Sequence, residues 1–529
     1  MRVLKTVEGL ERYLAQARAP QTLDQDPLPE VGLVPTMGNL HRGHRSLMER
    51  AQQENTLVVV SIFVNPLQFG PQEDLARYPH TPEQDLSLCE QVGVDAVFMP
   101  TPAVFYGTAN PLADQLTQVI PPQQMMAVLC GPHRPGHFEG VATVVTKLLS
   151  LVAPDRAYFG YKDAQQLAIL KRLVRDLSLP GQIIGCPTVR EASGLALSSR
   201  NIYLSEAEWL QAATLYQGLM VAQHCFRAGE RRSPALVAAV QQTLTQVADL
   251  RPQYVEVVHP ETLEPLDRID TMGMLAVAAH LGPTRLIDNV LLRDRQPIVA
   301  IDGPAGAGKS TVARQVAQRL NLLYLDSGAM YRAVTWQALE QGVDLRDEVA
   351  IAELVQGCDI HLAASGNDPA FAAYPSRLWL NGQEVTQLIR SAAVTAQVSL
   401  VSAQPSVRQT LLYQQQQYGV TGGVVMEGRD IGTQVFPQAE LKIFLTASVQ
   451  ERARRRQADL AIQQQPAVPL QELERAIDDR DRKDSSRRVA PLCKADDAIE
   501  LNTDGLTIED VVEKIVALFQ EKVGGIGAN

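Results

Sequence analysis

The first 190 residues alternate short, almost wholly apolar runs with stretches of helical periodicity. The apolar runs predict strands at 31–35, 56–65, 94–100, 155–160 and 181–189, and the periodic stretches predict helices at 44–55, 81–93, 140–152 and 164–177. The run TLVVVSIFVN at 56–65 is too apolar for a half-exposed strand, and it suits the centre of a parallel sheet. The alternation therefore predicts a doubly wound α/β sheet, whose ligands bind at the carboxyl ends of the strands.

From about Arg190 the pattern changes to a long helical stretch at 207–230, followed by short strands at 253–260 and 274–282. This order predicts a small α+β appendage that ends near 284–290. A new apolar strand begins at Pro297 after a linker of a few residues. We therefore expect one protein at 1–295, divided into 1–189 and 190–295, and a second at 296–529.

The second part begins with a strand at 297–302 that runs into a glycine-rich loop, a helix at 310–321 and a strand at 322–326. Later strands are predicted at 378–386, where Asn-Gly favours a hairpin turn, at 423–432 and at 441–447. A basic helix is predicted at 448–460. These elements indicate a second α/β domain.

Composition narrows the class of protein. The chain has 529 residues, 45% of them hydrophobic, with a formal net charge of −11, which argues against a general nucleic-acid binder. The six cysteines form no Cys-x-x-Cys pair, so we expect reduced thiols. The N-terminus carries glutamates where a signal peptide is apolar, and no run of about 18 apolar residues occurs. We expect a cytoplasmic protein without nucleic-acid or membrane partners.

The stretch VPTMGNLHRGH places His41 and His44 after a strand and at the head of a helix, on one helix face. Three interpretations fit this spacing: a capping or core role, a metal pair without an evident further ligand, or an anion site at a helix N-terminus. In the third, the imidazoles donate hydrogen bonds to a triphosphate and stabilise charge that develops on it.

Two later stretches favour the anion site. FGYKDAQQL follows a strand and places Lys162 and Asp163 at the mouth of a helix, and GLALSSRN offers Ser198, Ser199 and Arg200. Each alone is explained by a solvated ion pair or a serine-rich turn. Lysine and arginine bind phosphates. Because all of these residues belong to one predicted sheet, together they predict an ATP site.

The stretches VPTMGNLHRGH, SIFVNPLQFG, DLARYPHT, RPGHFEGVATVVTKL, KDAQQL and GLALSSRN, in this order over residues 1–290, resemble the pantoate–β-alanine ligase family, also called pantothenate synthetases. The resemblance implies a Rossmann-like nucleotidyltransferase fold and two half-reactions. Pantoate and ATP give pantoyl adenylate and pyrophosphate. β-Alanine then gives pantothenate and AMP.

The resemblance also implies site residues. His44 would be catalytic, assisted by His41, Lys162 and Arg200, while Gln68 and Gln166 would hold pantoate and β-alanine. The ATP site would comprise Met37, Gly38, Asn39, Leu40, His41, Arg42, Gly43, His44, Gly160, Tyr161, Lys162, Asp163, Val189, Leu197, Ser198, Ser199 and Arg200. The family usually has glutamate where this chain has Tyr161, which affects the support of Lys162.

The second part contains GPAGAGKS at 303–310, a complete G-x-x-x-x-G-K-[ST] motif between a strand and a helix. Its backbone N–H groups would cradle phosphates, Lys309 would reach the β and γ oxygens, and Ser310 would meet Mg²⁺. The stretches LDSGAMYR, EGRD and DDRDRKDSSRR are individually ordinary loops, turns or charged helix. Jointly they add a pocket of arginines and aspartates suited to a nucleoside monophosphate.

The stretches IDGPAGAGKST, LDSGAMYR, EGRDIGT, KIFLTAS and RD..D..R..APL resemble bacterial cytidylate kinases over 297–525. The resemblance implies γ-phosphoryl transfer from MgATP to CMP or dCMP, with a monophosphate-binding insert at about 358–400. The implied ATP site is Gly303, Pro304, Ala305, Gly306, Ala307, Gly308, Lys309, Ser310, Thr311, Arg452, Arg455 and Arg456, with the three arginines on a closing lid. The implied CMP site is Ser327, Tyr331, Arg332, Arg408, Arg429, Asp430, Arg480, Asp484 and Arg487, the last three on one helix face. Many relatives have aspartate at Glu427, which we leave out of this set.

Both resemblances together predict a bifunctional enzyme that uses ATP and Mg²⁺. Members of the ligase family generally form dimers, so the resemblance also predicts a homodimer through the first part. Two alternatives stay open: a kinase that prefers UMP or AMP, and a part that senses nucleotides without catalysis. The presence of His44, Lys162, Lys309 and the arginines disfavours the second alternative. The sequence gives no reason for the fusion.

Overall fold

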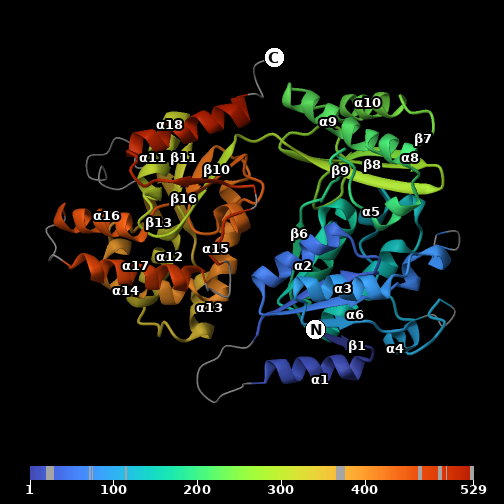
Figure 1. Ribbon diagram of the computed structural model, residues 1–529, viewed down its shortest axis with the longest axis horizontal. Helices are drawn as coiled ribbons and strands as arrows, with labels where there is room; N and C mark the ends of the chain where they lie inside the picture. The colour runs from blue at the N-terminus through green and yellow to red at the C-terminus, as the bar shows by residue number, and fades with distance from the viewer. Residues whose placement is uncertain are drawn as a thin grey trace. The chain divides into compact units, whose positions relative to one another are not determined.

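The computed structural model describes residues 1–19, 29–70, 73, 75–112, 116–364, 376–462, 468–485, 491–495 and 497–524. The chain divides into two compact units, Met1–Asp294 and Arg295–Asn529, coloured blue to green and yellow to red in Figure 1. Each unit has its own sheets and its own hydrophobic cores.

Unit 1 is built on a six-stranded sheet in the order β1-β4-β3-β2-β5-β6, and every neighbouring pair of strands is parallel. The strands are β1 Arg2–Leu4, β2 Val31–Thr36, β3 Leu57–Ile62, β4 Ala96–Phe98, β5 Arg156–Gly160 and β6 Gln182–Cys186. The helices of this domain are α1 Val7–Arg18, α2 Arg42–Glu54, α3 Pro82–Val92, α4 Pro102–Tyr106, α5 Gln123–Met126, α6 His137–Val152 and α7 Ala164–Asp176. The predicted doubly wound α/β fold is confirmed.

Helices cover both faces of this sheet, which explains the continuous apolar runs of its strands. On one face α1, α6 and α7 contribute Leu10, Leu149 and Leu170 to the core, and on the other face α2 and α3 contribute Met48 and Cys89. The carboxyl ends of β2, β3, β5 and β6 lie along one edge of the sheet, so the loops that follow them converge there.

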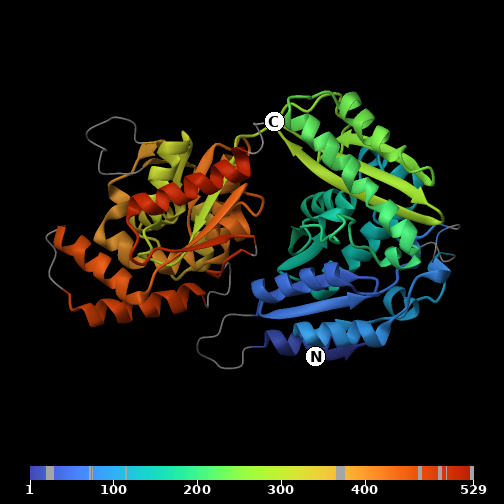
Figure 2. The same cartoon turned by 45° about the horizontal axis from the view of Figure 1, so that its top comes forward.

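The remainder of unit 1 is a small α+β subdomain, as predicted. Its antiparallel sheet consists of β7 Leu250–Val258, β8 Met272–Leu281 and β9 Thr284–Arg293, and it packs against α9 Thr214–Arg227 and α10 Ser233–Leu244 (Figure 2). The single helix expected at 207–230 is two helices, α8 Glu206–Ala212 and α9, separated at Ala213. Strand β7 begins three residues before the predicted start, and its register shifts between Pro252 and Tyr254. Proline lacks the N–H that a regular ladder requires, so an irregularity accommodates it.

Unit 2 contains a parallel sheet in the order β11-β15-β10-β16-β17. Its strands are β10 Ile298–Asp302, β11 Leu323–Asp326, β15 Val424–Glu427, β16 Leu441–Thr446 and β17 Ile499–Asn502. Its helices are α11 Lys309–Leu320, α12 Ser327–Glu340, α13 Glu348–Gln356, α14 Ala392–Ser402, α15 Pro405–Tyr418, α16 Val449–Ile462, α17 Leu470–Ser485 and α18 Ile508–Phe519. The predicted insert forms a small antiparallel sheet, β12 Ile360–Ala364, β13 Ser376–Leu380 and β14 Gln383–Glu384, followed by α14.

Two cores sandwich this second parallel sheet. Val312 of α11 and Val512 of α18 belong to the core on one face, whereas Met330 of α12 and Leu411 of α15 belong to the core on the other. Within the described ranges, no helix of either unit combines the length and apolarity needed to cross a bilayer.

Candidate active sites

In unit 1 the turn between β2 and α2 is held by a buried carboxylate from a distant helix. Asp85 of α3 accepts hydrogen bonds from the backbone N–H groups of Asn39 (3.0 Å) and Leu40 (2.7 Å). Gly38 and Asn39 both have positive φ angles, 83° and 50°, which the tight turn requires. Asp85 therefore fixes the backbone that leads into the two histidines, and no local sequence signal points to it.

The two histidines form a reciprocal cap at the N-terminus of α2. The Gly43 N–H donates to His41 Nδ1 at 3.1 Å, and the His41 N–H donates to His44 Nδ1 at 3.3 Å. The ring centroids are 4.1 Å apart. Because both Nδ1 atoms accept hydrogen bonds, the proton of each neutral ring lies on Nε2, which makes Nε2–H a donor. The structure thus combines two of the three interpretations: the imidazoles cap the helix and present donors at its N-terminus.

Burial keeps both imidazoles uncharged. Burial, followed by the charge of Lys162, lowers the pKa of His41 to about 4. Burial, followed by the neighbouring His41 and Lys162, lowers the pKa of His44 to about 3. At neutral pH these side chains are therefore hydrogen-bond donors rather than cations.

The loops after β5 and β6 bring the other predicted residues to the same edge. The segment around Ser199 is joined to the turn before α2, because Asn39 Nδ2 donates to Ser199 O (3.1 Å) and Ser199 Oγ donates to Asn39 O (3.2 Å). Together these loops enclose a cavity of about 250 Å³. The predicted residues that line it are Met37, His41, Gly43, His44, Gln68, Gly160, Lys162, Asp163, Gln166, Val189, Leu197, Ser198, Ser199 and Arg200.

Five predicted ATP-site residues lie outside this lining: Gly38, Asn39, Leu40, Arg42 and Tyr161. The first three form the turn itself. Arg42 pairs with Glu191 at 2.6 Å and its side chain is 65% exposed. Tyr161 stands where the family usually has glutamate, and its ring packs against Gly185 of β6. Because tyrosine has no carboxylate, this position offers no ion pair to the Lys162 side chain.

The cavity wall around Gln68 contains polar residues that sequence reasoning missed. Asn65 Nδ2 donates to Gln68 Oε1 at 3.1 Å, and His137 Nδ1 donates to the Gln68 backbone oxygen at 2.8 Å. Arg134 donates to His137 Nε2 and forms a two-bond ion pair with Glu73. Arg134 and His137 lie within RPGHFEG, a stretch that carries the family resemblance, so their place in the chain was a usable signal.

In unit 2 the glycine-rich loop follows β10 and leads into α11, as its motif predicts. Gly303 has φ 144°, and a Cβ there would lie 2.1 Å from the Leu445 oxygen of β16, so only glycine fits. Lys309 is buried and its Nζ donates to Pro304 O at 2.7 Å, within the loop itself. The loop therefore encircles the lysine at the position where phosphates bind in proteins with this motif.

A buried carboxylate lies beside this loop. Burial, followed by the charge of Asp326, raises the pKa of Glu427, while hydrogen bonds from Ser310 and Tyr324 act in the opposite direction. Ser310 is exposed. Ser310 lies in the first turn of α11, and Glu427 is the last residue of β15. A hydroxyl and a carboxylate are oxygen ligands of the kind that Mg²⁺ prefers, directly or through water, so these residues fit the ion.

The predicted CMP residues of the described chain lie on α12, on α15 and in the segment after β15. Arg408 is buried, forms an ion pair with Asp430, donates to Ser402 O at 3.1 Å and lies 5.5 Å from the Tyr331 ring centroid. Arg332 pairs with Asp326 at 2.6 Å, and Ser327 Oγ donates to Glu427 O at 2.7 Å. Arg429 follows β15 after one residue, Gly428. The side chains of Arg480 and Asp484, and Arg487 as a whole, lie outside the described residues, as does the predicted common helix face.

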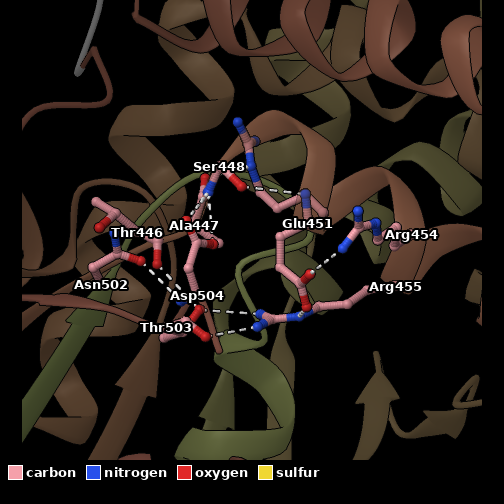
Figure 3. Close-up of polar contacts among 10 residues, drawn as sticks. Thr446, Ala447, Ser448, Glu451, Arg454, Arg455, Asn502, Thr503 and Asp504 are labelled. Carbon is pink, nitrogen blue, oxygen red and sulfur yellow. Dashed lines mark hydrogen bonds and ion pairs between the residues drawn. The ribbon is translucent and has the colours of Figure 1, made fainter. Parts of the chain in front are cut away.

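The predicted lid arginines differ in their surroundings. Arg452 is buried, donates to Ala305 O of the glycine-rich loop at 3.1 Å and pairs with Asp481 of α17 at 2.6 Å. Arg455 donates to Thr503 Oγ1 (3.0 Å) and Thr503 O (2.9 Å) after β17 (Figure 3). Arg456 is exposed. In Figure 3, Asp504 accepts both hydrogen bonds of the Ser448 N–H, at 2.9 and 3.2 Å, where the chain enters α16.

Comparisons with known proteins divide the chain at the same place. The family model for pantoate-β-alanine ligase matches residues 2–291, and the model for cytidylate kinase matches residues 299–521. The chain is 58% identical over 535 residues to the bifunctional pantoate ligase/cytidylate kinase of Trichormus variabilis, with 99% of each chain covered. It is 54% identical over 520 residues to the protein of that name in Synechococcus elongatus, with 98% of this chain and 96% of the other covered. A solved pantothenate synthetase of Thermus thermophilus superposes with a TM-score of 0.50 at 44% identity, over 55% of this chain and 99% of its own.

Proposed function

The chain belongs to the family of bifunctional pantoate ligases/cytidylate kinases, and from that premise we propose which unit carries each reaction and by which route. It is an enzyme with both ligase and kinase activities, and both families use ATP. Unit 1 condenses pantoate with β-alanine, and unit 2 phosphorylates CMP or dCMP.

In unit 1 the pantoate carboxylate attacks the α-phosphorus of ATP, which gives pantoyl adenylate and releases pyrophosphate. The observation that carries this proposal is the pair of neutral imidazoles, His41 and His44, whose Nε2–H donors border a cavity shared with Lys162 and Arg200. Donors of this kind stabilise the charge that builds on the phosphorus oxygens in the transition state. Gln68 and Gln166 hold pantoate in line, which supplies proximity. The β-alanine amine then attacks the acyl carbon and AMP leaves.

In unit 2 the glycine-rich loop holds the ATP phosphates, with Lys309 following the phosphoryl group in transfer. Arg332, Arg408 and Arg429 bind the CMP phosphate, and an ion pair with Asp430 holds the Arg408 guanidinium in place. Arg480, Asp484 and Arg487 complete the acceptor pocket. Because phosphoryl transfer needs little covalent help, positioning and electrostatics supply most of the catalysis.

Mg²⁺ is proposed for unit 2 because Ser310 and Glu427 supply suitable oxygens beside the loop. When bound there, the ion neutralises charge on the β and γ phosphates.

We further propose that the protein is a homodimer through unit 1, as its family resemblance implies. Light scattering of the intact chain and of residues 1–294 tests this: a monomer in both would contradict it.

Two variants of the intact chain test the assignment of the two reactions. His44→Ala should suppress pantoate-dependent, β-alanine-independent ATP–pyrophosphate exchange by about a hundredfold or more and leave CMP phosphorylation unchanged. Lys309→Ala should do the reverse. Exchange that requires β-alanine would refute the adenylate route, and loss of both activities in one variant would refute the separation of the sites.

A further inference from the structure

In the proposed ligase reaction the substrate β-alanine carries a carboxylate, and the residues proposed to bind the triphosphate leave it without a cationic partner. Among the described residues that line the unit 1 cavity, the lysine and arginine side chains are Arg134, Lys162 and Arg200. Lys162 and Arg200 stand in the loops after β5 and β6, beside the histidines, where the triphosphate is proposed to bind. The pantoate carboxylate is consumed in forming the adenylate. The second substrate, β-alanine, retains a carboxylate that also enters this cavity.

Arg134 lies on the Gln68 side of the cavity and is held in one orientation. Its Nε and Nη2 donate to the two Glu73 oxygens at 2.6 and 2.7 Å, and its Nη1 donates to His137 Nε2 at 2.8 Å. The side chain is only 13% exposed. These contacts use three of the five N–H donors of a guanidinium, so two donors remain for a ligand.

His137 links this guanidinium to the proposed pantoate residue. Its Nδ1–H donates to the Gln68 backbone oxygen at 2.8 Å, because a carbonyl oxygen can only accept. Its Nε2 lone pair therefore faces Arg134. Burial, followed by the Arg134 charge, lowers the His137 pKa to about 3, so the ring stays neutral. The Arg134 guanidinium is thus held near Gln68, with the His137 ring between the two residues.

Resting on the ligase function proposed above, we propose that Arg134 binds the carboxylate of β-alanine and selects amine substrates that carry one. Glu73 neutralises the guanidinium before substrate arrives, so a buried unpaired charge is avoided while the directed donors are kept. The carboxylate takes no part in bond making. Removing the Arg134 guanidinium should therefore slow the second half-reaction and leave the first almost unchanged.

The test compares the two half-reactions in Arg134→Gln. Pantoate-dependent ATP–pyrophosphate exchange without β-alanine should stay within about threefold of the parent, which also shows that the variant folds. The KM for β-alanine should rise roughly ten- to hundredfold, the range expected for lost hydrogen bonds to a charged group. The preference of the parent for β-alanine over β-alaninamide, in kcat/KM, should fall by a similar factor. Arg134→Lys, which keeps the charge, should recover part of that preference.

Arg156→Gln is the matched control. Arg156 is 15% exposed and pairs with Glu30 at 2.8 Å, but it lies outside the cavity lining. Its variant should keep the preference for β-alanine over the amide. Equal loss of exchange and of pantothenate synthesis in Arg134→Gln would overturn the proposal in favour of a structural role, and so would an unchanged substrate preference. Failure of the ligase function itself would appear separately, as absence of pantoate-dependent exchange in the parent protein.

Discussion

At the residue scale, the three histidines that line the unit 1 cavity differ in tautomer. His41 and His44 accept hydrogen bonds at Nδ1, whereas His137 donates from Nδ1. Their pKa values are lowered to between about 3 and about 4, mainly by burial. For these three histidines we expect imidazole ¹⁵N spectra of the ligand-free protein at pH 7 to show two Nε2–H rings and one Nδ1–H ring. None should protonate above pH 5, and titration of any of the three near pH 6.5 would contradict the structure.

A second residue-scale prediction concerns Asp85, whose carboxylate holds the turn before α2. Asp85→Asn removes a charged acceptor from two backbone N–H groups and places an amide donor opposite one of them. Hydrogen bonds to charged groups contribute about 1.5–3 kcal/mol. We expect the exchange reaction to fall roughly tenfold to hundredfold in kcat/KM while CMP phosphorylation is unchanged. A fully active variant would show that the turn keeps its conformation without Asp85.

At the element scale, helix α16 is anchored at its start. Asp504 accepts from the Ser448 N–H, and its charge lies at the positive end of the helix (Figure 3). Asp504→Ala should destabilise unit 2 by about 1 kcal/mol, the usual effect of losing an N-terminal cap. Because α16 carries Arg452 and Arg455, the KM for ATP in CMP phosphorylation should rise as well. Glu509→Ala, at another exposed acidic position of unit 2, serves as the control and should leave the KM unchanged.

At the same scale, the sequence predicted the sheets and the meeting of the site loops but missed contacts that depend on packing. Apolar runs predicted the parallel sheets, and motifs at strand ends predicted that Lys162 and Ser199 would meet His44, because parallel strands end at one edge. Asp85 was not predicted, since its contact with the turn before α2 spans about 45 residues and depends on how α3 packs. The break at Ala213 carries no glycine or proline that would have signalled it.

The same limit applies to charge partners. The resemblance predicted Arg408 and Asp430 as CMP-site residues, and the folded chain pairs the two with each other, which the sequence did not indicate. Glu73 and Arg134 are 61 residues apart, and only the fold brings them together. Motifs in the sequence were sufficient to propose candidate site residues, but the neutralising partner of each charge was set by tertiary packing.

At the scale of the whole molecule, two compact units with separate cores predict two independent enzymes. Fragments 1–294 and 295–529 should each fold and retain the ligase and the kinase activity, respectively, within about threefold of the intact chain. Separate expression with both assays measures this. Two folded but inactive fragments would mean that each site requires the other unit.

The two units should also respond to acid in opposite directions. In unit 1, His41, His44 and His137 have pKa values depressed below 6.5, mainly by burial, so the unfolded state binds protons first and stability is lost as pH falls through 6.5 toward 3. In unit 2, burial raises the pKa of Asp302 to about 6, so the folded state binds the proton first. That unit gains stability as pH falls through 6 toward 4.

Calorimetry of the intact chain and of each fragment measures the difference. One pH unit corresponds to about 1.4 kcal/mol per titrating group. Between pH 7 and pH 5 we expect unit 1 to lose roughly 2 kcal/mol for each histidine at most, less in sum because His41 and His44 interact, while unit 2 gains about 1 kcal/mol. The transition of unit 1 should move to lower temperature and that of unit 2 should hold or rise. Asp302→Asn removes the titrating group from unit 2 and should abolish its gain without affecting unit 1. If both transitions fall in parallel, the buried carboxyl of Asp302 does not carry the proton assigned to it.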